Sequence, residues 1–210
     1  METTGMTIRL HRGDLPDLKR YSGTVAIDTE TMGLDPRRDR LCVVQLSPGD
    51  GSADVVQIPP GGGASAPNLK ALLADPGRLK IFHFARFDIA MLFNALGVMP
   101  TPVYCTKIAS RLARTYTDRH GLKDLVREVL GVDLSKQQQS SDWGAESLSV
   151  AQVAYAASDV LHLHALKEKL DTMLAREGRS PLAAACFNFL PDRARLDLAG
   201  WAAEDIFAHS

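Results

Sequence analysis

Residues 24–31 read TVAIDTET, an apolar run that ends in two acids separated by a single residue. A strand alternates its side chains with a period of two, so the carboxylates of Asp28 and Glu30 leave the same face, with Cα atoms about 6.6–6.8 Å apart. Two like charges at this spacing repel each other unless a cation lies between them. Because hard divalent cations prefer oxygen ligands, this strand end predicts a metal site.

Two further acids stand in contexts that suit the same site. Asp88 follows the short predicted strand 80–83 and lies near the start of a predicted helix. Tyr155 and Asp159 are four residues apart, so they share one face of another predicted helix. That helix segment is rich in alanine, where an uncompensated carboxylate is costly. A hydrogen-bonded pair on a solvated helix is the alternative interpretation.

The composition indicates one soluble globular domain. The chain has 210 residues, 45% of them hydrophobic and 23% charged, and a formal net charge of −1, which argues against a broad basic surface that coats long nucleic acid. Cys42, Cys105 and Cys186 show no CxxC spacing, so neither a disulfide framework nor a zinc site is indicated. A polar N-terminus and the lack of a long apolar run predict no membrane association and a cytoplasmic location.

The periodicity predicts an α/β fold with a mixed sheet. We expect strands at residues 7–11, 25–28, 41–46, 54–58 and 80–83, with the second to fourth forming an antiparallel meander. We expect helices at 68–74, capped by Asn68, and at 87–96, 105–114 and 122–130. One long helix capped by Ser149 is expected to end near Gly178.

The segment after Gly178 has a different character. We take residues 1–178 as the catalytic domain and residues 179–210 as a C-terminal tail that completes it. The tail carries several large apolar side chains, which either pack back onto the domain or cover a subunit partner. These side chains are Phe187, Phe189, Leu190, Trp201, Ile206 and Phe207.

Three sequence motifs carry a family resemblance. IDTET (27–31), FHFARFD (82–88) and YAASD (155–159) resemble the three exonuclease motifs of the ribonuclease D family, the tyrosine branch of the DEDD 3′–5′ exonucleases. RLCVVQ (40–45), KQQQSSDW (136–143) and DIFAHS (205–210) further resemble the short bacterial nanoRNase C group. The likeness covers nearly the whole chain. Three motifs in the right order are far more specific than a single acid pair.

This resemblance implies a ribonuclease H-like 3′–5′ exonuclease fold, a mixed central sheet flanked by helices. It implies that two Mg²⁺ or Mn²⁺ ions are held by four acids, and that Tyr155 orients the attacking water. The four acids are Asp28, Glu30, Asp88 and Asp159. The implied substrates are short RNA oligonucleotides, including dinucleotides, and the implied assembly is a homo-oligomer, with a ring-shaped octamer as one form.

Substrate contacts are expected at three places. The first is the segment after Glu30, where an apolar side chain wedges against a base or, alternatively, packs in the core. The second is His83, for which a histidine satisfied within the fold is the alternative. The third is the polar run 136–143, for which an ordinary surface loop is the alternative. The residues are Thr31, Met32, Gly33, Leu34, His83, Lys136, Gln139 and Ser141.

A basic group between residues 107 and 123 could hold phosphates or form a solvated face. It comprises Lys107, Arg111, Arg114, Arg119, His120 and Lys123. Three rivals to short-RNA hydrolysis stay open. The first is the same chemistry on longer or structured RNA ends or on DNA. The others are a non-catalytic nucleic-acid binding module and a metal-binding interaction protein without hydrolytic function.

Overall fold

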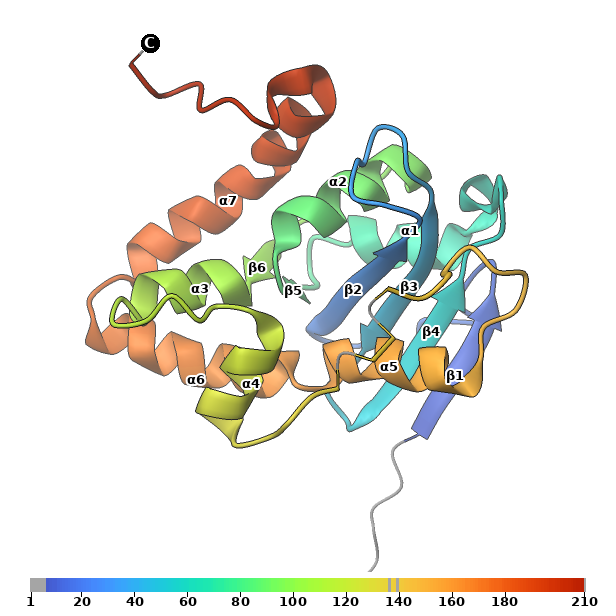
Figure 1. Cartoon of the computed structure of the whole chain (residues 1–210), viewed down its shortest axis with the longest axis horizontal. Coiled ribbons are helices and arrows are strands. Elements are labelled where there is room, and N and C mark those ends of the chain that lie inside the picture. Colours follow the sequence, from blue (N-terminus) through green and yellow to red (C-terminus); the bar gives the residue numbers. More distant parts are fainter. Residues whose placement is uncertain (1–6, 136, 139, 210) are drawn as a thin grey trace, which may run out of the picture.

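A six-stranded mixed sheet forms the centre of the protein (Figure 1). The computed structural model describes residues 7–135, 137, 138 and 140–209. The sheet order is β1-β4-β3-β2-β5-β6, with β2, β3 and β4 in the predicted antiparallel meander and the other pairs parallel. The strands are β1 (Thr7–Arg12), β2 (Val25–Thr31), β3 (Leu41–Ser47), β4 (Ser52–Gln57), β5 (Lys80–Phe82) and β6 (Val103–Cys105).

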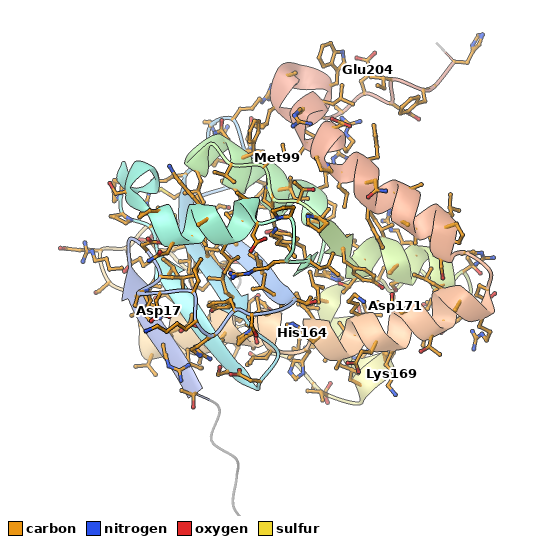
Figure 2. The ribbon with its side chains drawn as sticks, turned by 180° about the vertical axis from the view of Figure 1, so that it is seen from behind. Asp17, Met99, His164, Lys169, Asp171 and Glu204 are labelled. Carbon is orange, nitrogen blue, oxygen red and sulfur yellow. The ribbon has the colours of Figure 1, made fainter. Side chains whose placement is uncertain are left out.

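Helices cover both faces of this sheet. In Figure 1, α5 lies in front of the central strands, and Figure 2, seen from behind, shows the teal α1 across the opposite face. Strands β3 and β4 are therefore buried along their whole length. Among the described residues, no helix is long and apolar enough to span a membrane. The helices are η1 (Gly62–Ser65), α1 (Pro67–Ala74), α2 (Ala85–Leu96), α3 (Thr106–Ala113), α4 (Leu122–Leu130), α5 (Val150–Leu161), α6 (Leu163–Arg176), α7 (Ser180–Leu196) and η2 (Asp197–Trp201).

The single long helix predicted after Ser149 is wrong, because the chain turns at His162 between α5 and α6. His162 has φ −102° and ψ −6°, outside regular helix geometry. The two halves pack on different partners, α5 on the sheet and α6 mainly on α3. His164, labelled in Figure 2, fixes the start of α6 through a contact of its Nε2 with the carbonyl oxygen of Thr24 at 3.1 Å. The predicted cap at Ser149 is confirmed, with a complete capping box to Gln152.

The cap predicted for α1 is also wrong. Asn68 lies inside the helix, which begins at Pro67, and makes no side-chain cap. The carboxylate of Asp14 instead accepts hydrogen bonds from the backbone N–H groups of Asn68 and Leu69, each at 2.8 Å. An acid far away in sequence thus satisfies the free N–H groups of this helix end.

The C-terminal tail forms α7, which packs along α2 and against β6. Phe187 is buried and its ring centroid lies 4.5 Å from that of Tyr104. Part of the apolar tail therefore packs back onto the domain. Leu190 is buried as well. The side chains of Phe189, Trp201, Ile206 and Phe207 stay exposed and leave room for the second alternative, a subunit partner.

Candidate active site

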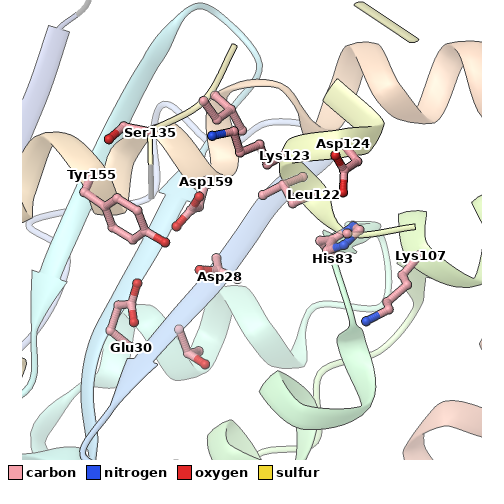
Figure 3. Close-up of a pocket in the computed structure, with 13 residues that line it drawn as sticks. Asp28, Glu30, His83, Lys107, Leu122, Lys123, Asp124, Ser135, Tyr155 and Asp159 are labelled. Atoms are coloured by element: carbon pink, nitrogen blue, oxygen red, sulfur yellow. The ribbon is translucent and has the colours of Figure 1, made fainter. Parts of the chain in front are cut away.

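Three carboxylates from two elements converge over the inner strand β2, towards its C-terminal end (Figure 3). Asp28 and Glu30 leave the same face of β2, as their spacing predicts, and Asp159 reaches them from α5. One ligand oxygen from each of these three side chains lies within 4.8 Å of the other two. Oxygen donors gathered this closely match the ligand preference of Mg²⁺, Mn²⁺ or Ca²⁺.

Asp88 lies next to this group of three but outside it. It occupies the first turn of α2, is only 3% exposed, and accepts a hydrogen bond from the Thr29 hydroxyl at 2.6 Å. Thr29 stands between the two acids of β2, so one strand orders three of the four carboxylates. The N-terminal end of α2 also favours a negative charge. Phe84, which precedes α2, adopts a left-handed conformation with φ 65°, a costly backbone state of the kind that gathers at functional sites.

Burial raises the pKa of all four acids, and repulsion by neighbouring acids adds to this for Asp28, Glu30 and Asp88. Burial, followed by the charges of Asp159 and Asp88, raises the pKa of Glu30 to about 9. The pKa of Asp28 is raised well above its ordinary value, first by burial and then by the other acids. Burial raises the pKa of Asp88 and that of Asp159 to about 7, against hydrogen bonds that lower them. Each carboxylate therefore resists ionisation without a counter-charge, so this donor set fits a divalent cation.

We expect metal binding to stabilise the protein more as the pH rises. An acid whose pKa is raised on folding stabilises the fold at low pH, and this contribution is lost as the pH rises through its folded pKa. For Glu30 the loss begins near the unfolded pKa of glutamate, about 4.3, and continues to the folded pKa of about 9. Metal binding becomes stronger over the same range because protons compete less. The shift in melting temperature between Mn²⁺ and chelator should therefore grow from pH 6 to pH 8. An equal shift at both pH values would contradict a carboxylate site.

Tyr155 lies one helical turn before Asp159 and shares its face of α5, as the spacing predicts. Its hydroxyl is hydrogen-bonded to the Asp159 carboxylate. Burial and the nearby carboxylates raise the pKa of Tyr155, so the phenol keeps its proton at neutral pH. The ring is held by Trp143, with centroids 6.0 Å apart. A protonated phenol fixed in this way can position a water molecule, but it cannot serve as a base.

A cavity of about 330 Å³ opens over the carboxylates, with acidic side chains on one side and basic side chains on the other. Figure 3 shows Glu30 and Tyr155 on one side and Lys107 on the other. This volume falls within the range of small-ligand sites. The lining residues are Asp28, Thr29, Glu30, His83, Lys107, Gly121, Leu122, Lys123, Asp124, Leu134, Ser135, Tyr155 and Asp159.

The comparisons with known proteins agree with this geometry. A family model described as 3′–5′ exonuclease matches residues 15–175. The chain belongs to the 3′–5′ exonuclease family. The resemblance to ribonuclease D, the ribonuclease H-like fold and the assignment to the exonuclease class are thereby confirmed at the level of the family.

The relatives of this chain differ in length. Ribonuclease D of Gluconacetobacter diazotrophicus is 35% identical over 193 residues, which is 92% of this chain and 46% of the relative. The chain thus spans less than half the length of that curated relative. Brucella melitensis NrnC with bound Mg²⁺ is 63% identical, with a TM-score of 0.94, over 98% of this chain and 100% of that one. The same protein bound to pGG is 64% identical, with a TM-score of 0.95 and the same coverage.

The structure places only some of the predicted substrate residues at the cavity. His83 lines the cavity, whereas the segment after Glu30 does not. Met32 and Leu34 are 61% and 85% exposed, so the alternative that they pack in the core is wrong. The Thr31 hydroxyl donates a hydrogen bond to the carbonyl oxygen of Gly33 at 2.5 Å, which shapes this exposed turn.

The polar run 136–143 is only partly described. Lys136 and Gln139 lie outside the described residues. Ser141 donates a hydrogen bond to the Gln138 side chain at 2.6 Å and is absent from the cavity lining, so the described part of the run does not place it at the site. Trp143 of this run is buried and meets Tyr155, which gives the run a supporting role.

The basic group between residues 107 and 123 also lies only partly at the cavity. Lys107 and Lys123 line the cavity and can meet phosphates there. Arg114 cannot, because it is 1% exposed and its guanidinium pairs with Glu128 and donates to the Ser110 hydroxyl. For Arg114 the phosphate-binding interpretation is therefore wrong.

Two polar residues that support the acids were missed in the sequence. Gln45 lies opposite Asp28 in the β2–β3 register, is fully buried, and donates from Nε2 to the Asp28 carboxylate at 3.3 Å. Thr29 supports Asp88 in the same manner. A glutamine inside the apolar run 41–46 was the available signal, because a buried amide needs a partner.

We expect Thr29→Val to weaken metal binding about tenfold, the lower range for loss of a group that orients a ligand. Thr29 is 7% exposed and valine has nearly its shape, so the lost hydroxyl is the main change. Without that hydrogen bond the pKa of Asp88 should rise further. Mn²⁺ titration at pH 7 measures the effect, and Thr29→Ser, which keeps the hydroxyl, serves as the control. Equal affinity in the valine and serine variants would remove Thr29 from the site.

Proposed function

We propose that this protein is a metal-dependent 3′–5′ exoribonuclease that releases 5′-monophosphates from very short RNA, including dinucleotides. One observation carries the proposal: the carboxylates of Asp28, Glu30 and Asp159 converge within 4.8 Å, beside the Tyr155 phenol. Family membership and the likeness to NrnC, which has been seen bound to pGG, support it.

In this proposal Asp28, Glu30, Asp88 and Asp159 hold two divalent cations. Such a pair, when bound, lowers the pKa of a water molecule and neutralises the leaving 3′ oxygen of a phosphodiester. Tyr155 has its proton engaged by Asp159, so its oxygen is free to accept a hydrogen bond from the attacking water and align it. The raised pKa of Tyr155 keeps it in this positioning role.

The preference for short RNA has support in the shape and charge of the site. The cavity of about 330 Å³ is near the lower end of the range for ligand pockets. Among the described residues, Lys107 and Lys123 are the lysines that line it, and the formal net charge of the chain is −1. Because affinity for long nucleic acid grows with the number of phosphate contacts, this arrangement suits a ligand with few phosphates.

Assembly and location belong to the same proposal. A homo-oligomer, with a ring-shaped octamer as one form, would cover the exposed apolar side chains of the tail such as Trp201 and Phe207. A cytoplasmic location would place the enzyme with short RNA fragments. Sedimentation of the purified protein tests the assembly.

The test of function uses 5′-labelled RNAs of roughly two to twenty nucleotides, with Mn²⁺, Mg²⁺ or chelator. We expect metal-dependent release of monophosphates, with dinucleotides consumed at least as fast as longer strands. Longer strands that shorten while dinucleotides persist would favour the rival with the same chemistry on longer RNA or DNA. Binding without hydrolysis in either metal would favour a non-catalytic module.

A further inference from the structure

The loop 142–149, which precedes α5, contains no helix or strand and is held by side chains from the sheet. Arg40, directly before β3, donates from Nη2 to the carbonyl oxygen of Gly144 at 3.3 Å. Gln57, the last residue of β4, donates from Nε2 to the carbonyl oxygen of Ala145 at 2.9 Å. Two side chains distant in sequence thus fix the backbone path of this loop.

The guanidinium of Arg40 fits closely between the loop and the sheet. Its Nη1 donates to the carbonyl oxygen of Ile58 at 2.8 Å. Gly144 leaves little room for a side chain, since a Cβ there would lie 3.2 Å from the Met32 sulfur and 3.3 Å from Nη2 of Arg40. The carbonyl oxygen of Arg40 also accepts from the backbone N–H of Met32 at 3.0 Å. Arg40 therefore joins the loop to the chain that follows Glu30.

Trp143 is the loop residue that reaches the active site. Its side chain is 3% exposed and packs against the ring of Tyr155. The indole Nε1 is enclosed, and no group among the described residues forms a hydrogen bond with it. The position of the indole therefore depends on its packing and on the backbone path of the loop. Any displacement of the loop at Gly144 is passed to the ring of Tyr155.

We propose that Arg40 and Gln57 are positioning residues, which hold the loop so that Trp143 keeps the Tyr155 hydroxyl aligned with the attacking water. This inference rests on the proposed function and adds two residues to it. The hydroxyl stands at the far end of the ring, so a tilt of the ring moves it more than any other atom of that side chain. A misplacement of about 1 Å can lower a rate about a hundredfold. Neither Arg40 nor Gln57 lines the cavity, so both act through the loop.

The experiment is a double-mutant cycle measured in kcat, with an RNA dinucleotide and Mn²⁺. Arg40→Met keeps an apolar stem and removes both donors, and Gln57→Leu removes the amide without a change of charge. We expect each variant to lower kcat about tenfold, with KM and Mn²⁺ affinity within about threefold of wild type. In the Tyr155→Phe background each should lower kcat by less than about twofold, because no hydroxyl is left to misplace. Arg38→Met, a control at an exposed side chain of the same turn, should keep the wild-type kcat.

The emission of Trp143 follows the loop without any turnover. The chain has two tryptophans, so Trp201→Phe leaves Trp143 as the single emitter. In that background, Arg40→Met and Gln57→Leu should shift the emission to the red and strengthen its quenching by acrylamide. Arg38→Met should change neither property.

The outcomes separate this inference from the function on which it rests. Wild-type kcat in both variants, an equal loss in the Tyr155→Phe background, or unchanged Trp143 emission would overturn the positioning role and leave the exonuclease proposal intact. Failure of the wild-type protein to cleave any dinucleotide would overturn both proposals. Melting temperatures near wild type exclude a folding defect, and Gln57→Leu carries the same test if Arg40→Met fails to fold.

Discussion

Asp28→Asn is expected to lower nucleotide release at least about a thousandfold while raising the melting temperature of the metal-free protein. The amide keeps the shape of the side chain but removes an acid whose pKa is raised by burial and by the neighbouring acids. Such an acid opposes folding above its unfolded pKa, so the variant loses a metal ligand while its metal-free fold loses this cost. We expect the melting temperature in chelator to rise by at least about 2 °C, the effect of 1 kcal/mol in a chain of this size.

A matched control separates the site from a general effect of removing charge. Asp192 is exposed and pairs with Arg195 on the surface of α7, so Asp192→Asn should change neither activity nor stability appreciably. Activity is measured as release of monophosphate from an RNA dinucleotide with Mn²⁺ in excess. If Asp28→Asn kept more than about a tenth of wild-type turnover, Asp28 could not be an essential ligand.

Tyr155→Phe is expected to lower kcat about a hundredfold with little change in KM, in the lower range for loss of a group that acts on the reacting water. Phenylalanine keeps the ring that packs against Trp143 and removes only the hydroxyl that is hydrogen-bonded to Asp159. Metal and substrate binding should therefore persist while the water loses its alignment. The Mn²⁺ affinity of the variant should stay within about threefold of wild type.

The matched control is Tyr116→Phe, which removes a phenol hydroxyl at a side chain that is 74% exposed. We expect wild-type kinetics from this variant. Single-turnover rates with the dinucleotide isolate the chemical step from product release. Wild-type single-turnover rates in Tyr155→Phe would exclude the proposed positioning role.

Local sequence pattern was sufficient to predict the parts of the fold that are set by a few neighbouring residues. The alternation in β2 placed Asp28 and Glu30 on one face, and the four-residue spacing placed Tyr155 with Asp159. The meander of β2 to β4 followed from short turns between apolar runs. These features are set by covalent geometry and the period of each element, so tertiary context has little room to change them.

Other features depend on contacts that no local pattern contains. The break at His162 arises because α5 and α6 pack on different partners, although the apolar spacing continues through it. The strand β6 has three residues, too few for an alternation to show. Asp14 reaches α1 from a distant segment, and Thr29 reaches Asp88 across 59 positions. Such partners are decided by tertiary packing, which local sequence pattern does not record.

Asp28, Glu30 and Asp159 are expected to hold a divalent cation. Anomalous diffraction from crystals of the protein grown with Mn²⁺ can locate such an ion, because manganese scatters anomalously and carboxylate oxygens do not. We expect at least one strong anomalous peak among these three carboxylates, roughly 2.0–2.6 Å from their oxygens, and its loss in Asp28→Asn. Full Mn²⁺-dependent turnover together with an anomalous map that is empty at this position would show that these carboxylates do not hold the catalytic metal.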